Sequence, residues 1–208
     1  MRGKGRKSRK SIYLIGGGLL LVAAALCLTV YNIGDNWRAG WEAGQVLAEM
    51  EEAAENGGVS MPAEEDGGEE NEAGQALAVI PVDGNDYIGV LEIPDQELIL
   101  PVMEEWSYPK LRIVPCRYMG SAKEGDLIIA GHNYDRHFGR LKNLQPGEPV
   151  IFMDAEGNRY EYEVQQVVTL QGTDVEEMEE GEWNLTLFTC TVGGQFRVTV
   201  RCGEKQDG

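Results

Sequence analysis

The sequence predicts a mostly β fold, a closed antiparallel barrel or a sandwich of seven or eight strands with short helical connectors, preceded by a transmembrane helix and an acidic stalk. Short runs of β-forming residues follow one another from about residue 87 to residue 201. Gly, Pro, Asn and Asp separate these runs, as turns require. Seven or eight strands within about 120 residues favour a closed barrel or a sandwich.

An apolar segment near the N-terminus predicts the membrane helix. Residues 12–33 contain no charge, and six basic residues and no acidic one lie in residues 1–10. As a helix rising about 1.5 Å per residue, the apolar segment spans roughly 33 Å, enough for the roughly 30 Å hydrocarbon core of a bilayer. The basic tail, residues 1–11, predicts a cytoplasmic N-terminus and an extracellular remainder. The alternative is a signal peptide cleaved at the A-x-A site Ala23–Ala25.

The charge balance argues against one class of function. The chain carries 18 basic and 35 acidic residues, a formal net charge of −17, although its first ten residues are strongly basic. The remainder is therefore even more acidic, and it has no basic patch with interleaved aromatic residues. Because such a surface repels a polyanion, we expect no nucleic-acid partner.

Residues 34–78 are expected to form a stalk between the membrane and the folded domain. Large apolar side chains recur at roughly helical spacing in residues 35–55, which predicts a helix. Residues 56–74 are rich in Gly and Glu and contain almost no large apolar side chain. They cannot bury enough surface to fold alone, so we interpret them as a flexible acidic linker.

Residues 79–208 are expected to form the folded domain. Ser107–Ile113 and Phe138–Leu144 are interpreted as short helical or irregular connectors, and Asp154–Asn158 as a hairpin turn. The predicted strands are Tyr87–Ile93, Glu97–Val102, Asp126–Ala130, Pro149–Met153, Arg159–Leu170, Leu185–Thr189 and Phe196–Arg201.

The cysteines suggest a use for a free thiol. Cys27 lies in the apolar segment, and Cys116, Cys190 and Cys202 follow it in the exported part. An odd number of exported cysteines leaves at least one unpaired unless a second chain takes part. A disulfide between Cys116 and Cys202 is one alternative, and a nucleophilic thiol is the other.

Three side chains of complementary chemistry occur at strand ends. His132 follows an apolar strand, and Cys190 ends another strand just before the loop that holds Gly193 and Gly194. Arg197 begins the last strand, seven residues past the cysteine. Together they permit acyl transfer: a thiolate attacks a carbonyl, an imidazole moves the proton, and a cation stabilises the oxyanion.

Each of these residues also has an ordinary structural interpretation. Cys190 alone could be a small buried hydrophobe, His132 could bond a loop carbonyl, and Arg197 could be a surface ion-pair partner. His137 lies in a charged loop, where we expect solvent exposure.

Two neighbouring features leave alternatives open. Asp135 could join the two histidines around a metal ion, but no matching pair spacing supports such a site. Asn133 or Asp135 could instead orient the imidazole. Arg201 lies four residues past Arg197, on the same strand face, so alternation does not choose between the two arginines.

Several segments resemble the sortase family. Thr186–Cys190, with the sequence TLFTC, resembles the sortase signature T-L-x-T-C, and Arg197–Val200 resembles the R-x-x-V strand that follows it. Ala130–Asn133 is similar to the segment around the sortase histidine. Tyr87–Pro94 and Leu98–Val102 resemble the opening strands of the sortase barrel. The resemblance covers about residues 87–201, with the segments in the family order.

This resemblance implies a sortase-type barrel and a cysteine transpeptidase. Cys190 would attack the backbone carbonyl within an LPxTG-like sorting signal of a secreted protein. His132 would protonate the leaving amine and later deprotonate the incoming one, and Arg197 would position the substrate and stabilise the oxyanion. An amine, commonly of a peptidoglycan precursor, would resolve the thioacyl intermediate and join the protein to the cell wall of a Gram-positive bacterium.

The resemblance also implies the partners of the site. Thr189, Asn133, Gly193 and Gly194 are expected to contact substrate, and we expect no cofactor and no metal ion. The connection 171–183 is too short for the helical insertion of class B enzymes, and no pilin-type lid motif precedes the barrel. The alternatives are an inactive barrel that acts as a scaffold, and an L,D-transpeptidase. The latter family places its cysteine in an S-H-G-C context, which is absent here.

Overall fold

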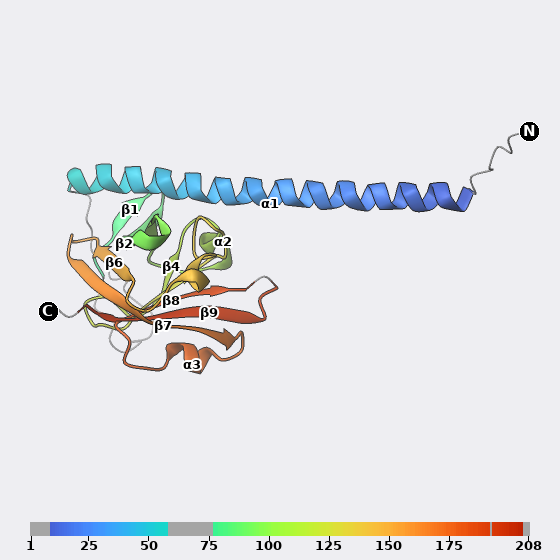
Figure 1. Ribbon diagram of the computed structural model, residues 1–208. Helices are drawn as coiled ribbons and strands as arrows, with labels where there is room; N and C mark the ends of the chain where they lie inside the picture. Colours follow the sequence, from blue (N-terminus) through green and yellow to red (C-terminus); the bar gives the residue numbers. More distant parts are fainter. Residues whose placement is uncertain (1–8, 58–76, 192, 206–208) are drawn as a thin grey trace, which may run out of the picture. The chain divides into compact units, whose positions relative to one another are not determined.

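The computed structural model describes residues 9–57, 77–191 and 193–205 (Figure 1). The predicted acidic linker, residues 56–74, lies outside the described residues except at its start, and so does most of the basic tail. The chain divides into two compact units, residues 1–38 and residues 39–208.

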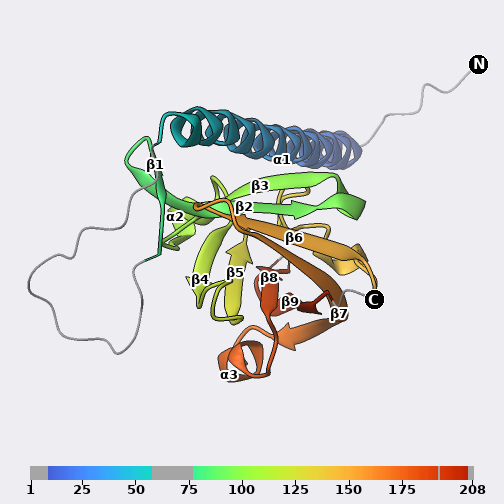
Figure 2. The same ribbon diagram turned by 90° about the vertical axis from the view of Figure 1, so that its left-hand side faces the viewer.

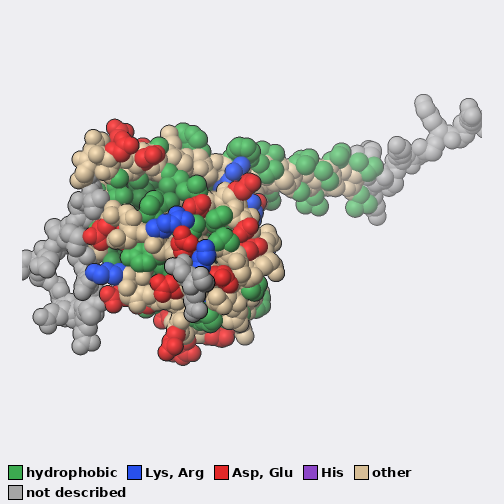
Figure 3. All heavy atoms as spheres, turned by 60° about the vertical axis from the view of Figure 1, so that its left-hand side comes forward, with side chains coloured by type: hydrophobic (Ala, Val, Ile, Leu, Met, Phe, Trp, Pro, Cys, Tyr) green, Lys and Arg blue, Asp and Glu red, His purple; other side chains and the backbone are tan. Residues whose placement is uncertain are grey.

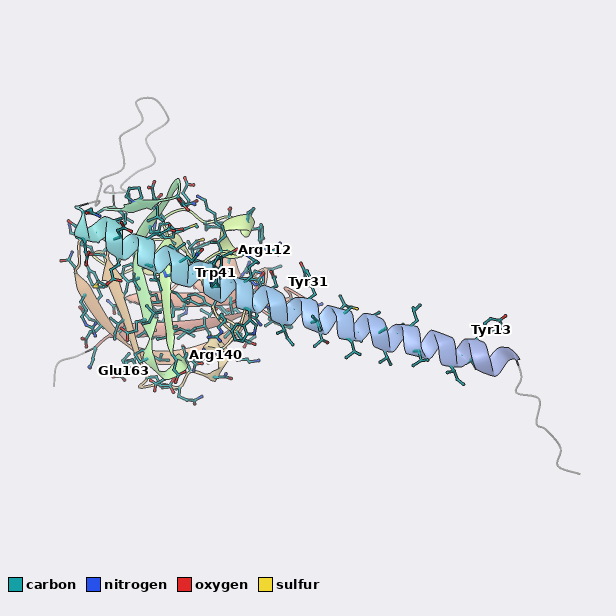
Figure 4. All side chains as sticks on the ribbon, turned by 90° about the horizontal axis from the view of Figure 1, so that it is seen from above. Tyr13, Tyr31, Trp41, Arg112, Arg140 and Glu163 are labelled. Carbon is teal, nitrogen blue, oxygen red and sulfur yellow. The ribbon has the colours of Figure 1, made fainter. Side chains whose placement is uncertain are left out.

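Helix α1, Arg9–Glu55, is one continuous helix through the two segments that we expected to be helical. By length and composition it is the one helix among the described residues that could cross a membrane. Its large apolar side chains from Tyr13 to Ile33 are more than half exposed. Tyr13 and Tyr31 project outward from this part of the helix in Figure 4. An exposed apolar surface of this kind is what a lipid environment would cover.

The last turns of α1 contribute to the core of the larger unit. Ala43 and Met50 are buried in its main hydrophobic cluster, and Val46 and Ala53 pack against that cluster. The unit of residues 39–208 therefore includes part of the predicted stalk. The domain start at residue 79 stays a prediction.

All seven predicted strands are present, within three residues at each end. The two strands that sequence patterns did not indicate are short. The strands are β1 (Ile80–Val82), β2 (Asn85–Ile93), β3 (Leu98–Met103), β4 (Cys116–Met119), β5 (Leu127–Gly131), β6 (Pro149–Asp154), β7 (Arg159–Gln171), β8 (Leu185–Cys190) and β9 (Phe196–Glu204). The short helical elements are η1 (Pro94–Gln96), α2 (Tyr108–Leu111), η2 (Leu141–Asn143) and α3 (Val175–Glu179).

The strands form a closed barrel, as expected. Their order is β1-β2-β3-β4-β5-β8-β9-β7-β6, and β6 also pairs with β2, so eight strands close and β1 lies outside the ring (Figure 2). Gly89 lies at the seam, where a Cβ atom would be 2.1 Å from the carbonyl oxygen of Met153. Only glycine allows the two backbones to approach this closely.

The barrel is mixed, which corrects the expectation of an antiparallel one. The pairs β3–β4 and β5–β8 are parallel. The chain can return from β5 to a parallel neighbour because the hairpin of β6 and β7 lies between β5 and β8 in sequence.

Two hydrophobic clusters organise the larger unit. The main cluster fills the barrel, with fully buried side chains such as Leu91, Ile129, Leu187 and Val200. Burying such a side chain stabilises the fold by about 1.5–3 kcal/mol. A second cluster, which we call the outer cluster, is separate from it. Its members are Ile128, Ala130, Leu170, Met178 and Phe188.

Candidate active site

Three adjacent strands bring the predicted catalytic residues together. Cys190 on β8 is directly opposite Arg197 on β9. On the other side of β8, Thr189 is opposite Gly131 of β5, so His132 continues the same register beside Cys190. Neighbouring strands lie about 4.8 Å apart. The order β5-β8-β9, visible in Figure 2, thus places the cysteine between the histidine and the arginine.

Strand alternation places Cys190 and Arg197 on one face of the sheet, and its continuation past β5 assigns His132 to the same face. Side chains alternate along a strand, and directly opposite residues share a face. Cys190 therefore shares the face of Phe188, and His132 that of Ala130. Phe188 and Ala130 belong to the outer cluster, so the face in question is the outer face of the barrel.

Cys190 differs from the other cysteines of the larger unit in exposure. It is exposed, whereas Cys116 and Cys202 are buried, and all of them are free thiols. Burial raises the pKa of both buried thiols to about 12. Because both thiols are free, the alternative of a Cys116–Cys202 disulfide is not present in this structure. Cys190 is the thiol of residues 39–208 that solvent and substrate can reach.

The loop after β5 holds His132 against a tyrosine. The imidazole of His132 stacks on the ring of Tyr134, with ring centroids 3.9 Å apart and planes 23° from parallel. Arg112, which follows α2 and is labelled in Figure 4, donates from Nε to the Tyr134 hydroxyl at 3.4 Å. No sequence motif indicated the stacking of His132 on Tyr134, two residues of the same loop.

Two glycines allow this loop to fold tightly. A Cβ atom on Gly131 would be 2.4 Å from the ring of Phe138, and one on Gly139 would be 2.6 Å from the carbonyl oxygen of Asn133. The backbone amide of Phe138 donates to the carbonyl of His132 at 3.1 Å. These contacts bring the end of the loop back to its first residues and fix the backbone that carries His132.

The expectation for His137 was wrong. Its side chain is fully buried, with its ring edge-on to Tyr134 at 5.5 Å between centroids. The charged neighbours Asp135 and Arg136 are exposed, but the tight loop turns His137 and Phe138 inward.

Arg197 and Arg201 have different environments. Arg197 is half-buried, its Nη1 donates to the carbonyl of Gly172, and its guanidinium carbon lies 6.0 Å from the centroid of the Phe188 ring. Its Nε has no hydrogen-bond partner among the described residues. Arg197 is thus the arginine at the cysteine, with donor capacity left over.

Arg201 instead anchors the connection between β7 and β8. It is only 5% exposed. Its Nη1 donates to the carbonyl of Met178 at 2.6 Å and to Oγ1 of Thr186 at 3.1 Å, and its Nη2 donates to the carbonyl of Glu177. Both carbonyls belong to α3, whose last turn lacks intrahelical partners for them. Burial lowers the pKa of Arg201.

Helix α3 also contacts the barrel through β4. The Tyr118 hydroxyl donates to Oε1 of Glu179 at 3.0 Å. Burial, and then this hydrogen bond, raise the pKa of Tyr118. Tyr118 also packs on the outer cluster, edge-on to Phe188 at 5.3 Å. The short acidic connection expected from the sequence is therefore held over the outer cluster at several points.

Of the predicted substrate-binding residues, Thr189 points away from Cys190, and the others lie in the loops that follow β5 and β8. Thr189 is 3% exposed and alternates away from Cys190, toward the barrel interior. Gly193 and Gly194 lie in the β8–β9 loop with φ of 90° and 71°, values that favour glycine. Asn133 is half-buried in the loop after His132.

The acidic surface offers no metal site among the residues described. No group of three or more His, Cys, Asp or Glu side chains there could hold an ion. Figure 3 shows acidic side chains scattered over one face of the domain among a few basic ones, rather than gathered at one point.

Comparison with known proteins identifies the family. The profile described as Sortase domain matches residues 91–204, more than half of the chain. A search of the curated proteins found no match.

Solved sortases have the same fold. Sortase C1 from Streptococcus agalactiae is 25% identical with a TM-score of 0.53, over 62% of this chain and 72% of that one. Sortase A from Corynebacterium diphtheriae is 17% identical with a TM-score of 0.54, over 89% and 97% of the two chains. A Clostridium perfringens sortase D5 transpeptidase is 19% identical with a TM-score of 0.51, over 58% and 80%. These neighbours carry three class letters, so the likeness shows the fold and does not select a class within the family. The chain belongs to the sortase family.

Proposed function

We propose that this chain is a membrane-anchored cysteine transpeptidase that cleaves an LPxTG-like sorting signal of secreted proteins and transfers the acyl group to a cell-wall amine. The observation that carries the proposal is the strand register, which sets Arg197 of β9 directly opposite Cys190 and ends β5 beside Thr189, one residue before His132. Family membership supports the same reaction class.

In the proposed first half-reaction, the thiolate of Cys190 attacks the substrate carbonyl and a tetrahedral oxyanion forms. The amide bond then breaks, the leaving amine takes a proton from His132, and a thioester remains on Cys190. In the second half-reaction, His132 takes a proton from the incoming amine, which attacks the thioester and releases the thiolate. Atoms and charge balance without a cofactor.

Arg197 is proposed to position the substrate and to stabilise the oxyanion. Its guanidinium is on the strand position opposite Cys190 and lies over Phe188, and of the five N–H donors of a guanidinium the Nη1 group binds Gly172. The extended substrate is proposed to lie along the outer face, bordered by Asn133, Gly193 and Gly194. Thr189 would act from the interior side of β8, where its hydroxyl has no hydrogen-bond partner within the described part of the chain.

The proposed setting is the outer face of the cell membrane. The apolar part of α1 would span the bilayer with a cytoplasmic N-terminus, because the basic tail precedes it. The exported domain would then meet secreted substrates as they emerge and would reach peptidoglycan precursors. The proposed partners are thus a sorting-signal protein, an amine acceptor and the membrane.

A transfer assay tests the proposal. The full chain in detergent is incubated with a library of LPxTG-like peptides and an amine acceptor, and products are read by mass. We expect cleavage and transfer that Cys190→Ala abolishes and that Cys116→Ala leaves within a few-fold, because Cys116 is buried. Equal losses in both variants would mean that the nucleophile is misassigned. A folded chain with no product would favour the inactive scaffold barrel.

A further inference from the structure

We propose that Tyr134 is a positioning residue for the reaction, holding the ring of His132 in the orientation that proton transfer at Cys190 requires. The inference rests on the proposed function. It begins from the stacked pair, whose ring centroids are 3.9 Å apart. Because an imidazole on a single-bonded side chain can rotate, something has to select its orientation.

Tyr134 is itself held from several directions, which makes it a rigid support. Its hydroxyl accepts a hydrogen bond from Arg112, and its ring meets the edge of the buried His137. Its carbonyl accepts hydrogen bonds from the amides of His137 and Gly139, both at 2.9 Å. These contacts come from the residue after α2, from a buried side chain of the same loop and from the loop backbone.

The geometry of the stack determines what it constrains. Nearly parallel rings at this separation restrict rotation of the imidazole out of the shared plane, and the stack covers the face of the imidazole and not the ring edge that carries its nitrogens. A proton shuttle needs this combination, because its plane must be fixed and its edge must be open. The contact is with the face of the imidazole, so Tyr134 would act through His132 and not on the substrate.

Aromaticity at position 134 is therefore the property that matters. Phenylalanine keeps the stacked face and loses the hydrogen bond from Arg112, whereas leucine fills similar space without a π-face. We expect Tyr134→Phe to keep kcat within about threefold and Tyr134→Leu to lower kcat about tenfold, with KM within about twofold in both. Tyr108→Leu is the matched control, because Tyr108 is exposed and has an aromatic edge contact with Trp106.

A spectroscopic readout separates positioning from general stability. The chain has two histidines, so selective labelling of histidine gives one set of ring signals for each. The set that disappears in His132→Gln belongs to His132. In the full chain in detergent, the face of Tyr134 should shift the His132 ring protons upfield. The shift should persist in Tyr134→Phe and disappear in Tyr134→Leu.

The proposal would be overturned by equal kcat in Tyr134→Leu and Tyr134→Phe, or by a His132 signal that does not move in Tyr134→Leu. A loss confined to KM would also contradict it, because substrate contact would then explain the effect. If the parent chain shows no transfer, the proposed function fails, but the ring shift still decides whether Tyr134 holds His132.

Discussion

Replacing Arg201 with methionine should weaken the fold, while the same replacement at Arg197 should weaken catalysis. The two arginines lie four residues apart on one face of β9, so strand alternation does not distinguish them. Their surroundings do, because Arg201 binds the carbonyls of α3 and Arg197 is opposite Cys190.

The expected size of the Arg201→Met effect follows from its hydrogen bonds. The variant leaves the carbonyls of Glu177 and Met178 and the hydroxyl of Thr186 without this donor. A hydrogen bond from a charged donor contributes about 1.5–3 kcal/mol, but burying the guanidinium offsets part of the total. We expect a loss of about 2–3 kcal/mol in the free energy of unfolding, or about 5–10 °C in Tm. Activity at low temperature should fall less than tenfold.

Arg197→Met should show the opposite profile. The side chain is half-buried and makes one hydrogen bond, to Gly172, so the unfolding free energy should change by less than about 1 kcal/mol. Loss of an oxyanion donor lowers kcat by roughly 100-fold or more.

Thermal denaturation and peptide-transfer kinetics on the full chain measure the two profiles. An Arg201→Met variant with unchanged Tm and roughly 100-fold lower kcat, beside an active Arg197→Met, would mean that the two assignments are reversed. Equal Tm losses in both variants would refute the distinction between them.

The remaining predictions concern alkaline stability and the loop after β5. The raised pKa values of Cys116 and Cys202 stabilise the fold fully below about pH 9, the usual range for a free thiol, and this stability is lost as pH rises through about 12. Denaturant titrations should therefore show the unfolding free energy falling by up to about 2.7 kcal/mol per pH unit in that window. The double variant Cys116→Ala with Cys202→Ala should show a smaller dependence of the unfolding free energy on pH. A flat curve for the parent chain would contradict the burial of these thiols. Gly131→Ala places a Cβ atom 2.4 Å from the Phe138 ring and should lower the unfolding free energy by about 1–3 kcal/mol and kcat/KM at least about tenfold. Gly44→Ala in α1 meets no atom within 4 Å and should be neutral or stabilising, so equal losses in both glycine variants would refute the steric argument.

The barrel was predictable because its long strands carry the pattern of half-buried strands. In β7, residues 159–171, polar and apolar side chains alternate over most of the length, and a Gly-containing turn precedes it. Strand β4 escaped notice because it has only four residues and pairs with β3 through the single partners Met103 and Cys116. The parallel pairing of β5 with β8 depends on which strands become neighbours across the barrel, and local patterns do not contain that information.

The site was partly predictable for a similar reason. Cys190 and His132 each end a strand, and that position is visible in the sequence. Strand alternation did not choose between Arg197 and Arg201, whereas the resemblance to the R-x-x-V strand favoured Arg197; the register of β8 with β9 adds that Arg197 is opposite Cys190 and Arg201 is opposite Thr186. The burial of His137 and the stacking of Tyr134 on His132 depend on a loop conformation that Gly131 and Gly139 make possible. The charged residues next to His137 in the sequence therefore led to the wrong expectation that it is exposed.

The most direct test of the account is the mass of the full chain after rapid quenching of its reaction with an LPxTG-like peptide, without an amine acceptor. We predict an acyl adduct that peptide mapping places on Cys190, that an added amine removes, and that is absent from Cys190→Ala. Cys116 and Cys202 should carry no adduct, because both thiols are buried and their pKa values are raised to about 12. An adduct on either buried cysteine, or transfer without any thioester on Cys190, would contradict the central claim.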